Sequence, residues 1–327
     1  MNILILSAGT RNKVVQYFKK ELGKSGKVIA TDCSNLAPAL YDADKHYIVP
    51  RISEPGYVDL ILDICRKESI DGVFSLIDPE LSLLAKERER FLAVGATPVV
   101  SPYELVETCL DKYKMYELLC RMQIPTGKCY GKKEDFYRAL QNGEASYPVF
   151  VKPVKGSASM DIHKVCCEKE IELLFERHDG LMIQEYMDGT EYGADVYIDM
   201  LTGKCTSIFI KEKVKMRAGE TDKSVSVKDE KLFAIIEKFV EKCGFYGMID
   251  IDIFQVKDTY YISEVNPRFG GGYPHAHECG VNIPEQVIRN LKGESNRSSI
   301  GRYRAGICMM KYNEIAIQDL SDTEIIR

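Results

Sequence analysis

The chain has 327 residues, 45% of them hydrophobic, which is enough for two or three compact domains of roughly 100–200 residues each. Its formal net charge of -5 argues against nucleic acid as a partner. The apolar run at residues 2–6 is too short for a signal peptide or a membrane span, so we expect a cytoplasmic protein with no membrane partner. Eleven cysteines without a Cys-x-x-Cys pair predict reduced thiols.

The first third of the chain alternates strand and helix patterns. We expect strands at 2–7, 27–31, 72–75 and 97–100, and helices at 13–22, 57–68 and 79–91. This alternation predicts a parallel sheet covered by helices, which we place in a domain of residues 1–105. Ligands of such sheets bind beyond the carboxyl ends of the strands. The loops 8–11, 32–34 and 76–80 are therefore candidate substrate contacts.

A second segment, residues 106–188, reads as a compact α+β unit. A helix predicted over 103–122 leads into this segment. Pro102 precedes the helix and Pro125 follows it. A strand ending at Lys152, strands at 162–165 and 181–186 and a helix at 168–176 follow. The remainder, 189–327, is rich in predicted strands and has a long helix at 230–243.

Within this last segment, residues 247–266 have the alternating pattern of a β-hairpin. If the turn has three residues, 257–259, then Asp252 lies opposite Glu264, with Asn266 alongside. Facing carboxylates repel unless a cation lies between them, and oxygen ligands suit Mg²⁺ bound to substrate phosphates. We therefore predict a metal site at Asp252, Glu264 and Asn266. A two-residue turn would separate the two carboxylates, and a solvated hairpin face is the alternative.

Three features in this order resemble the ATP-grasp superfamily: Lys152 with a loop of small residues after it, the strand around Glu185, and the acidic hairpin. The most specific part is Glu264-Val-Asn266-Pro-Arg268. The likeness is greatest to the halves of the carbamoyl phosphate synthetase large subunit, biotin carboxylase and the carboxylate-amine ligases. The resemblance implies an α/β parallel-sheet domain (pre-ATP-grasp) followed by an α+β ATP-grasp fold with a small mobile lid.

The resemblance also implies a nucleotide pocket. Lys112 and Lys152 match the lysines that contact phosphates in the family, whereas ordinary surface lysines are the alternative. The loop after Lys152 looks like the lid loop, where glycine permits a change of conformation on closure. The residues implied to contact ATP are Lys112, Lys152, Lys155, Gly156, Ser157, Gln184, Glu185, Tyr186, Met187, Glu191 and Lys223.

Within that set, the segment 184–187 resembles the hinge that holds adenine. Met187 would pack on the base and Glu185 would accept its amino hydrogens, while Glu191 matches a residue that binds the ribose. Solvated strand charges are the alternative for the two glutamates.

Three cations are implied to act in catalysis: Lys152, Arg217 and Arg268. Arg217 and Lys223 fall in a segment that lies beside the phosphates in the carbamoyl phosphate synthetase group, where cations stabilise developing charge. A flexible polar loop is the alternative. The planar donor fork of Arg268 suits a γ-phosphate and an acyl-phosphate.

The expected substrate contacts come from the first and last domains. Arg11 is suited to hold a carboxylate, and Asp78 and Glu80 an amine, although acidic residues at a helix N-terminus are an equal alternative for the last two. A structural role is the more frequent one for His275. The full set is Arg11, Asp78, Glu80, Arg268, Gly271 and His275.

The resemblance implies an ATP-dependent ligase that uses Mg²⁺, or Mn²⁺, to make an acyl-phosphate from a small carboxylate. An amine then attacks it, and ADP and phosphate leave. Two alternatives stay open: an enzyme that phosphorylates bicarbonate or carbamate, and an ATP-binding protein without catalysis. A homodimer is compatible with each. The substrate could be an amino acid, a peptide, a sugar acid or a nucleotide precursor.

Overall fold

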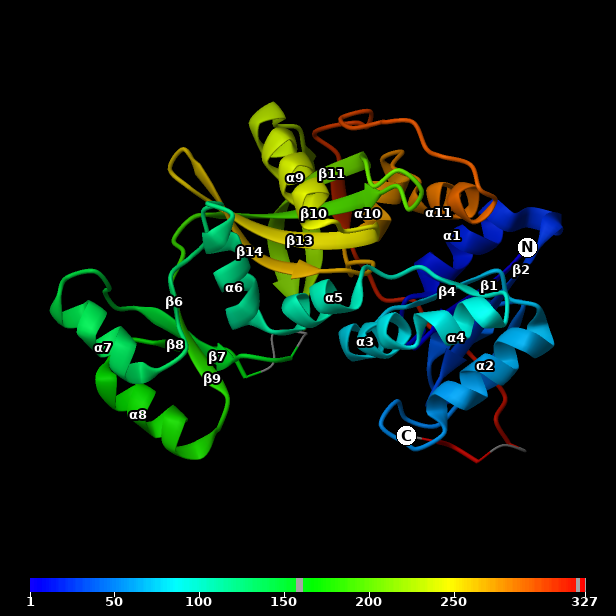
Figure 1. The fold of residues 1–327 in the computed structure, drawn as a ribbon, viewed down its shortest axis with the longest axis horizontal. Helices are drawn as coiled ribbons and strands as arrows, with labels where there is room; N and C mark the ends of the chain where they lie inside the picture. The colour runs from blue at the N-terminus through cyan, green and yellow to red at the C-terminus, as the bar shows by residue number, and fades with distance from the viewer. Residues whose placement is uncertain (157–160, 322–323, 327) are drawn as a thin grey trace.

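The computed structural model describes residues 1–156, 161–321 and 324–326, and within them three sheets follow one another along the chain (Figure 1). The first sheet is parallel and has five strands, the second has four, and the third has six antiparallel strands. The predicted fold class is confirmed, an α/β domain followed by an α+β fold.

The first domain is a parallel sheet in the order β3-β2-β1-β4-β5. Its strands are β1 (Asn2–Leu6), β2 (Lys27–Asp32), β3 (Lys45–Ile48), β4 (Gly72–Ser75) and β5 (Thr97–Pro98). Around them lie α1 (Asn12–Leu22), η1 (Gly23–Ser25), η2 (Pro38–Asp42), α2 (Tyr57–Glu68), α3 (Asp78–Lys86) and α4 (Arg88–Ala93). The chain order reverses between β1 and β4, so the loops that follow these two strands meet at a topological switch point.

Two predicted helices are each divided. The helix expected at 79–91 is α3 and α4, which meet at Glu87. The helix expected at 103–122 is α5 (Tyr103–Leu110) and α6 (Lys112–Arg121). The break falls at Asp111, whose backbone is extended and whose side chain accepts the N–H groups of Tyr113 and Lys114. Asp111 is thus the N-cap of a second helix.

The lid is a small sheet covered by helices on one face. Its strands are β6 (Cys129–Tyr130), β7 (Val149–Pro153), β8 (His163–Val165) and β9 (Leu181–Glu185), and its helices are α7 (Lys133–Gln141) and α8 (Glu168–Arg177). Phe136, Val151 and Ile183 form the core beneath the helices. Since successive side chains alternate along a strand, Lys152 and Gln184 lie on the opposite face of the sheet.

The third sheet carries the predicted hairpin and runs in the order β14-β13-β10-β11-β12-β15. Its strands are β10 (Thr190–Ile198), β11 (Cys205–Arg217), β12 (Glu220–Val227), β13 (Gly247–Val256), β14 (Thr259–Asn266) and β15 (Cys308–Met310). The helices of this part are α9 (Glu230–Cys243), α10 (Tyr273–Glu278) and α11 (Ile283–Leu291). The segment expected around Arg217 and Lys223 is the β11–β12 hairpin, which is paired as antiparallel strands and is not an irregular loop.

The first and third parts of the chain share one hydrophobic core. Phe18 of α1 packs on Phe74 of β4 with 4.9 Å between ring centroids, and Phe269 lies 6.0 Å and 5.6 Å from them. Because Phe269 directly follows Arg268, this packing holds Arg268 beside the loops after β1 and β4.

After β15 the chain returns to the first domain. The Asn35 amide donates to the Glu324 carbonyl at 2.7 Å, and the Ile326 N–H donates to Asn35 Oδ1 at 3.0 Å. This segment crosses the region between the third sheet and the first domain (Figure 1). In the part of the chain that the structure describes, no helix has the length and apolarity needed to cross a membrane.

Candidate active site

The hairpin pairs Asp252 with Glu264, as predicted, and it also pairs Asp250 with Asn266. The turn that leads to this pairing differs from the predicted one, however. Val256 pairs directly with Thr259, so the turn has two residues and the predicted three-residue turn is wrong.

A β-bulge corrects the register that this shorter turn would impose. Ile253 pairs with Ile262 but Asp252 pairs with Glu264, which leaves Ser263 as the extra residue. Without the bulge, Ser263 would oppose Asp252 and Glu264 would point to the other face of the sheet. The bulge is therefore what brings the two carboxylates together.

The pair of carboxylates is suited to a divalent cation. Among the described residues no hydrogen bond or ion pair occupies the Glu264 carboxylate, whereas Asp252 Oδ1 accepts from Lys213 at 2.6 Å. Those residues contain no group of three or more histidine, cysteine, aspartate or glutamate side chains placed for a metal. Two carboxylates and the Asn266 amide thus leave ligand positions for water and phosphate, which is how Mg²⁺ is usually bound.

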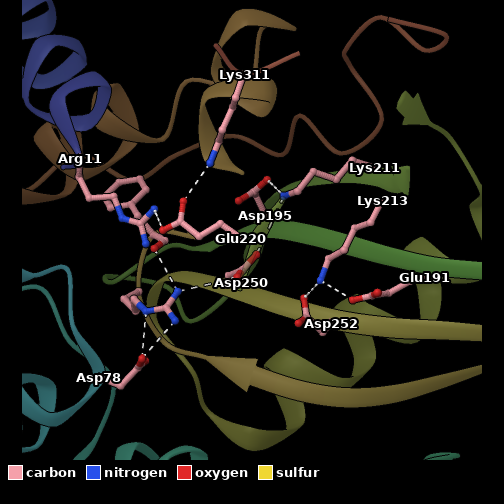
Figure 2. Close-up of polar contacts among 12 residues, drawn as sticks. Arg11, Asp78, Glu191, Asp195, Lys211, Lys213, Glu220, Asp250, Asp252 and Lys311 are labelled. Atoms are coloured by element: carbon pink, nitrogen blue, oxygen red, sulfur yellow. Dashed lines mark hydrogen bonds and ion pairs between the residues drawn. The ribbon is translucent and has the colours of Figure 1, made fainter. Parts of the chain in front are cut away.

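Lys213 was not singled out from the sequence, although it lies at the centre of the acidic strands. Its ammonium contacts Glu191 at 2.8 Å as well as Asp252 (Figure 2). Burial lowers the pKa of Lys213, but the two carboxylates outweigh burial and raise the pKa above its ordinary value. A permanently charged lysine therefore orients both the predicted ribose ligand and a predicted metal ligand.

The two lysines predicted to contact phosphate come from different elements: Lys112 begins α6, and Lys152 lies in β7 of the lid. Lys152 is 6% exposed, and burial lowers its pKa while the Glu264 charge acts in the opposite direction. Lys112 donates to the Gly156 carbonyl, and Lys155 forms an isolated β-bridge with Asp111. The lid loop thus begins next to the N-terminus of α6. Ser157 lies outside the described residues.

The predicted hinge is the connection from β9 to β10. Glu185 Oε2 accepts the Lys128 N–H at 3.1 Å, and Gln184 is buried. A Cβ on Gly127 would lie 3.1 Å from the Met187 sulfur, so this glycine permits close packing of the hinge.

A cavity of about 540 Å³ opens beside this hinge. The ring of Tyr186 faces it and carries the Lys164 ammonium 3.9 Å from its centroid. Neither Lys112 nor Lys152 lines this cavity, which therefore lies away from the predicted phosphate positions.

Arg268 is held between two acids. Its Nε and Nη2 lie 3.2 Å and 3.1 Å from Asp78 Oδ2, and its Nη1 lies 3.8 Å from Asp250. Asp78 also begins α3, which agrees with the helix N-terminus interpretation, whereas its predicted contact with a substrate amine stays a prediction. Burial raises the pKa of Asp250 to about 6, against the effect of Lys211. Lys211 lies 2.5 Å from the buried Asp195 and 4.0 Å from Asp250, so acids and cations alternate in this row of ion pairs from Asp195 to Asp78.

A second ion-pair group adjoins this row. Glu220 accepts from Arg11 at 2.6 Å and from Lys311 at 2.9 Å (Figure 2). Burial alone would raise the pKa of Glu220, but the two cations outweigh burial and lower it. A Cβ on Gly271 would lie 2.6 Å from the Glu220 carboxyl group, so glycine is needed where this group packs on the backbone.

Two residues predicted to contact the substrate are buried. Glu80 is 1% exposed, accepts from the hydroxyls of Tyr57 and Ser75, and has a pKa raised by burial. His275 is 2% exposed. Its Nδ1 lies 2.7 Å from the Ser224 hydroxyl and its Nε2 lies 3.0 Å from a backbone carbonyl. Both side chains are structural, because their polar atoms have partners and no exposed face.

The predicted catalytic residue Arg217 and the predicted ATP contact Lys223 both face Asp222. Arg217 lies 2.9 Å and Lys223 3.6 Å from its carboxylate. The Arg217 side chain is 51% exposed, so it is accessible at the tip of the β11–β12 hairpin. Their roles toward phosphate stay predictions.

The buried His275 should give stability a pH dependence. Burial and the Lys211 charge lower the pKa of His275 to about 4, from an unfolded value of about 6.5. Its contribution to stability is therefore complete above about pH 6.5 and is lost as the pH falls toward 4, because the unfolded chain binds the proton more readily. We expect His275→Asn to reduce this pH dependence.

Urea titrations of the free energy of unfolding, near neutral pH and near the folded-state pKa, measure the effect. His178→Asn at an exposed site is the matched control. An equal loss of stability on acidification in wild type and His275→Asn would contradict the expectation.

Lys152 of the lid sheet lies close enough to Glu264 and Asp252 of the acidic hairpin for their charges to act on it, and this combination of a buried cation with facing carboxylates is suited to binding phosphate and a divalent cation. Residues 109–272, half of the chain, match the ATP-grasp domain, and residues 3–100 match the PylC-like N-terminal domain. The chain belongs to the ATP-grasp family. Members of this family bind MgATP or ADP.

The chain is also similar in sequence to distant relatives. The arginine-specific large chain of carbamoyl phosphate synthase from Geobacillus stearothermophilus is 25% identical over 79% of this chain and 26% of its own length. The chain thus spans about a quarter of that relative.

Two solved structures have the same fold. The biotin carboxylase domain of Hydrogenobacter thermophilus 2-oxoglutarate carboxylase has a TM-score of 0.76 and 18% identity, over 94% of this chain and 73% of that one. An L-amino acid ligase from Bacillus licheniformis has a TM-score of 0.66 and 21% identity, over 89% and 74%.

Proposed function

We propose that this protein is an ATP-dependent ligase that activates a substrate carboxylate as an acyl-phosphate and joins it to an amine. The observation that carries this proposal is the Asp252–Glu264 pair, in which the Glu264 carboxylate has no hydrogen-bond or ion-pair partner among the described residues. The charge of Glu264 acts on both Lys152 and Arg268. Family membership supports ATP-dependent activation of a carboxylate. The amine and the C–N bond are our extension.

The nucleotide would lie between the lid and the third sheet. Lys112, Lys152 and the lid loop at Lys155 and Gly156 would bind its phosphates, and the hinge from Gln184 to Met187 would hold the base. Asp252, Glu264 and Asn266 would hold Mg²⁺, or Mn²⁺, as oxygen ligands. The bound ion would supply neutralisation of the phosphate charge.

In this scheme a carboxylate oxygen of the substrate attacks the γ-phosphorus, and the bond to the β-phosphate oxygen breaks to release ADP. The amine then attacks the acyl carbon, phosphate leaves, and the amine proton passes to water. Lys152 and Arg268 would stabilise the transferring group through charge and orientation. Arg217 and Lys223 would approach the phosphates only by leaving Asp222.

Two alternatives have some support. The carbamoyl phosphate synthase relative and the carboxylase domain, which was solved with bicarbonate, favour bicarbonate as a second candidate substrate. The Hydrogenobacter domain is a dimer, and a homodimer of this chain stays a proposal. A protein without catalysis is less well supported, because it has no need for a carboxylate near Lys152 that, like Glu264, lacks a hydrogen-bond or ion-pair partner in residues 1–156, 161–321 and 324–326.

ADP release from MgATP tests the proposal. Purified protein is incubated with carboxylates of different classes, each with hydroxylamine as a common amine, and separately with bicarbonate. We expect ADP and a hydroxamate in equal amounts with one class of carboxylate. ADP release that requires bicarbonate alone would favour the second candidate, and no ADP above the carboxylate-free control would overturn the ligase.

A further inference from the structure

One ion-pair group near the active site stays open to a ligand: Arg11, Glu220 and Lys311, here called the Glu220 group. Its side chains are 22%, 34% and 26% exposed. By contrast, the Lys211–Asp195 pair is 1% and 3% exposed, and the Arg268–Asp78 pair is 12% and 11% exposed. The Glu220 group is thus more accessible to a ligand than either of these pairs.

Three distant parts of the chain build the group. Arg11 comes from the loop after β1, Glu220 begins β12, and Lys311 follows β15 (Figure 2). Backbone pairing fixes Lys311, because its N–H donates to the Asp222 carbonyl at 2.9 Å. The group lies next to the reaction site, because Gly271, which packs against Glu220, is three residues from Arg268.

The group also has unused hydrogen-bonding capacity. The guanidinium of Arg11 has five N–H donors and the ammonium of Lys311 has three, while the Glu220 carboxylate has about four acceptor positions. Each cation contacts one oxygen of Glu220. A ligand can therefore be added without breaking either ion pair.

We propose that the Glu220 group recognises an α-amino acid as the carboxylate substrate, an inference that rests on the proposed ligase function. Glu220 accepts the ammonium group, and Arg11 and Lys311 donate to the carboxylate. An acid among the cations would weaken a site for a simple anion by like-charge repulsion. With an ammonium in the ligand, the same acid becomes a recognition element.

The spacing of the group selects the α-amino acid. Because both cations touch the same carboxylate, at 2.6 Å and 2.9 Å, the ligand charges that match them must also be close together. In an α-amino acid the ammonium and the carboxylate are attached to one carbon atom. A molecule whose charges lie at opposite ends satisfies only one side of the group.

The test compares carboxylates that differ only in the amino group. Hydroxylamine-dependent ADP release is measured with L-amino acids, with the same acids lacking the amino group, and with their N-acetyl derivatives. We expect kcat/KM for the amino acid to exceed both analogues by about a hundredfold or more, because each analogue leaves Glu220 without the ammonium that it is placed to accept.

Variants separate recognition of the ammonium from general damage. Glu220→Gln should lower kcat/KM for the amino acid and reduce its advantage over the analogues, with the KM for ATP unchanged. Lys311→Met should lower kcat/KM for amino acid and analogues alike. Lys204→Met, at an exposed ion pair with Glu241, is the control and should change neither value.

Equal or faster reaction of the analogues in the wild type overturns this inference and leaves the ligase in place. An undiminished advantage of the amino acid in Glu220→Gln also overturns it. If no compound releases ADP, the proposed ligase is overturned and this inference with it.

Discussion

Glu264→Gln should strongly reduce turnover with little change in fold. Gln keeps the size of the side chain and removes the charge from the carboxylate that faces Asp252 and has no hydrogen-bond or ion-pair partner among the described residues. A metal ion on a transferring phosphoryl group contributes several kcal/mol of transition-state stabilisation, and about 1.4 kcal/mol corresponds to tenfold in rate. We therefore expect kcat to fall by about a hundredfold or more.

The dependence on Mg²⁺ makes this test specific. The concentration of Mg²⁺ that gives half-maximal ADP release should rise in Glu264→Gln. Asp258→Asn removes one charge from the exposed turn of the same hairpin and is the matched control, with a rate close to that of wild type. A normal rate and a normal Mg²⁺ requirement in Glu264→Gln would remove the metal assignment.

Lys211→Met should give a large loss of stability. Lys211 and Asp195 are buried and lie 2.5 Å apart, and burial raises the pKa of Asp195 while Lys211 opposes that rise. Removing one partner leaves an uncompensated charge in the interior, which costs about 3–5 kcal/mol. We expect that decrease in the free energy of unfolding, measured by urea titration near neutral pH.

Two comparisons identify the cause of the loss. The double variant Lys211→Met/Asp195→Asn removes both charges and should recover part of the stability. Lys204→Met breaks an exposed pair and should cost about 0–1 kcal/mol. The loss of stability in Lys211→Met should become smaller as the pH falls. Asp195 has a raised pKa in the folded state, so it binds a proton there at a higher pH than in the unfolded chain. A deficit near 1 kcal/mol or below would contradict this account of the buried pair.

Local pattern predicted most of the architecture. The pattern of apolar residues predicted four of the five strands of the first domain but missed the short strand β3, and the strand expected at 181–186 is β9. The break between α5 and α6 was missed because it depends on one capping residue. Asp111 caps α6 with its own side chain, whereas the apolar pattern continues through that position.

The hairpin shows why a correct pairing can follow from a wrong turn. Asp252 was predicted opposite Glu264 because their alternation and approximate spacing were visible. The two-residue turn shifts the strand pairing by one residue relative to the predicted turn, and the bulge at Ser263 shifts it back by one residue. A bulge of this kind leaves no pattern of its own in a single sequence, so only the three-dimensional structure separates the two routes.

Long-range charge pairs were also beyond prediction. Arg268 and Asp78 are 190 residues apart, and their contact depends on packing between the first and third parts of the chain. Lys213 stood within the segment noted beside the phosphates, but its contacts with Glu191 and Asp252 arise from neighbouring strands of one sheet. Lys311 gave no signal, because its role depends on the pairing of β15 with β12.

The central claim is that a substrate carboxylate attacks the γ-phosphate of ATP. The most direct test uses a carboxylate substrate labelled with ¹⁸O on both oxygens, with MgATP and an amine, followed by mass spectrometry of the released phosphate. We predict one ¹⁸O atom in each phosphate, because the oxygen that attacks phosphorus leaves with it when the amine displaces the acyl-phosphate. ADP formation with unlabelled phosphate would contradict the claim.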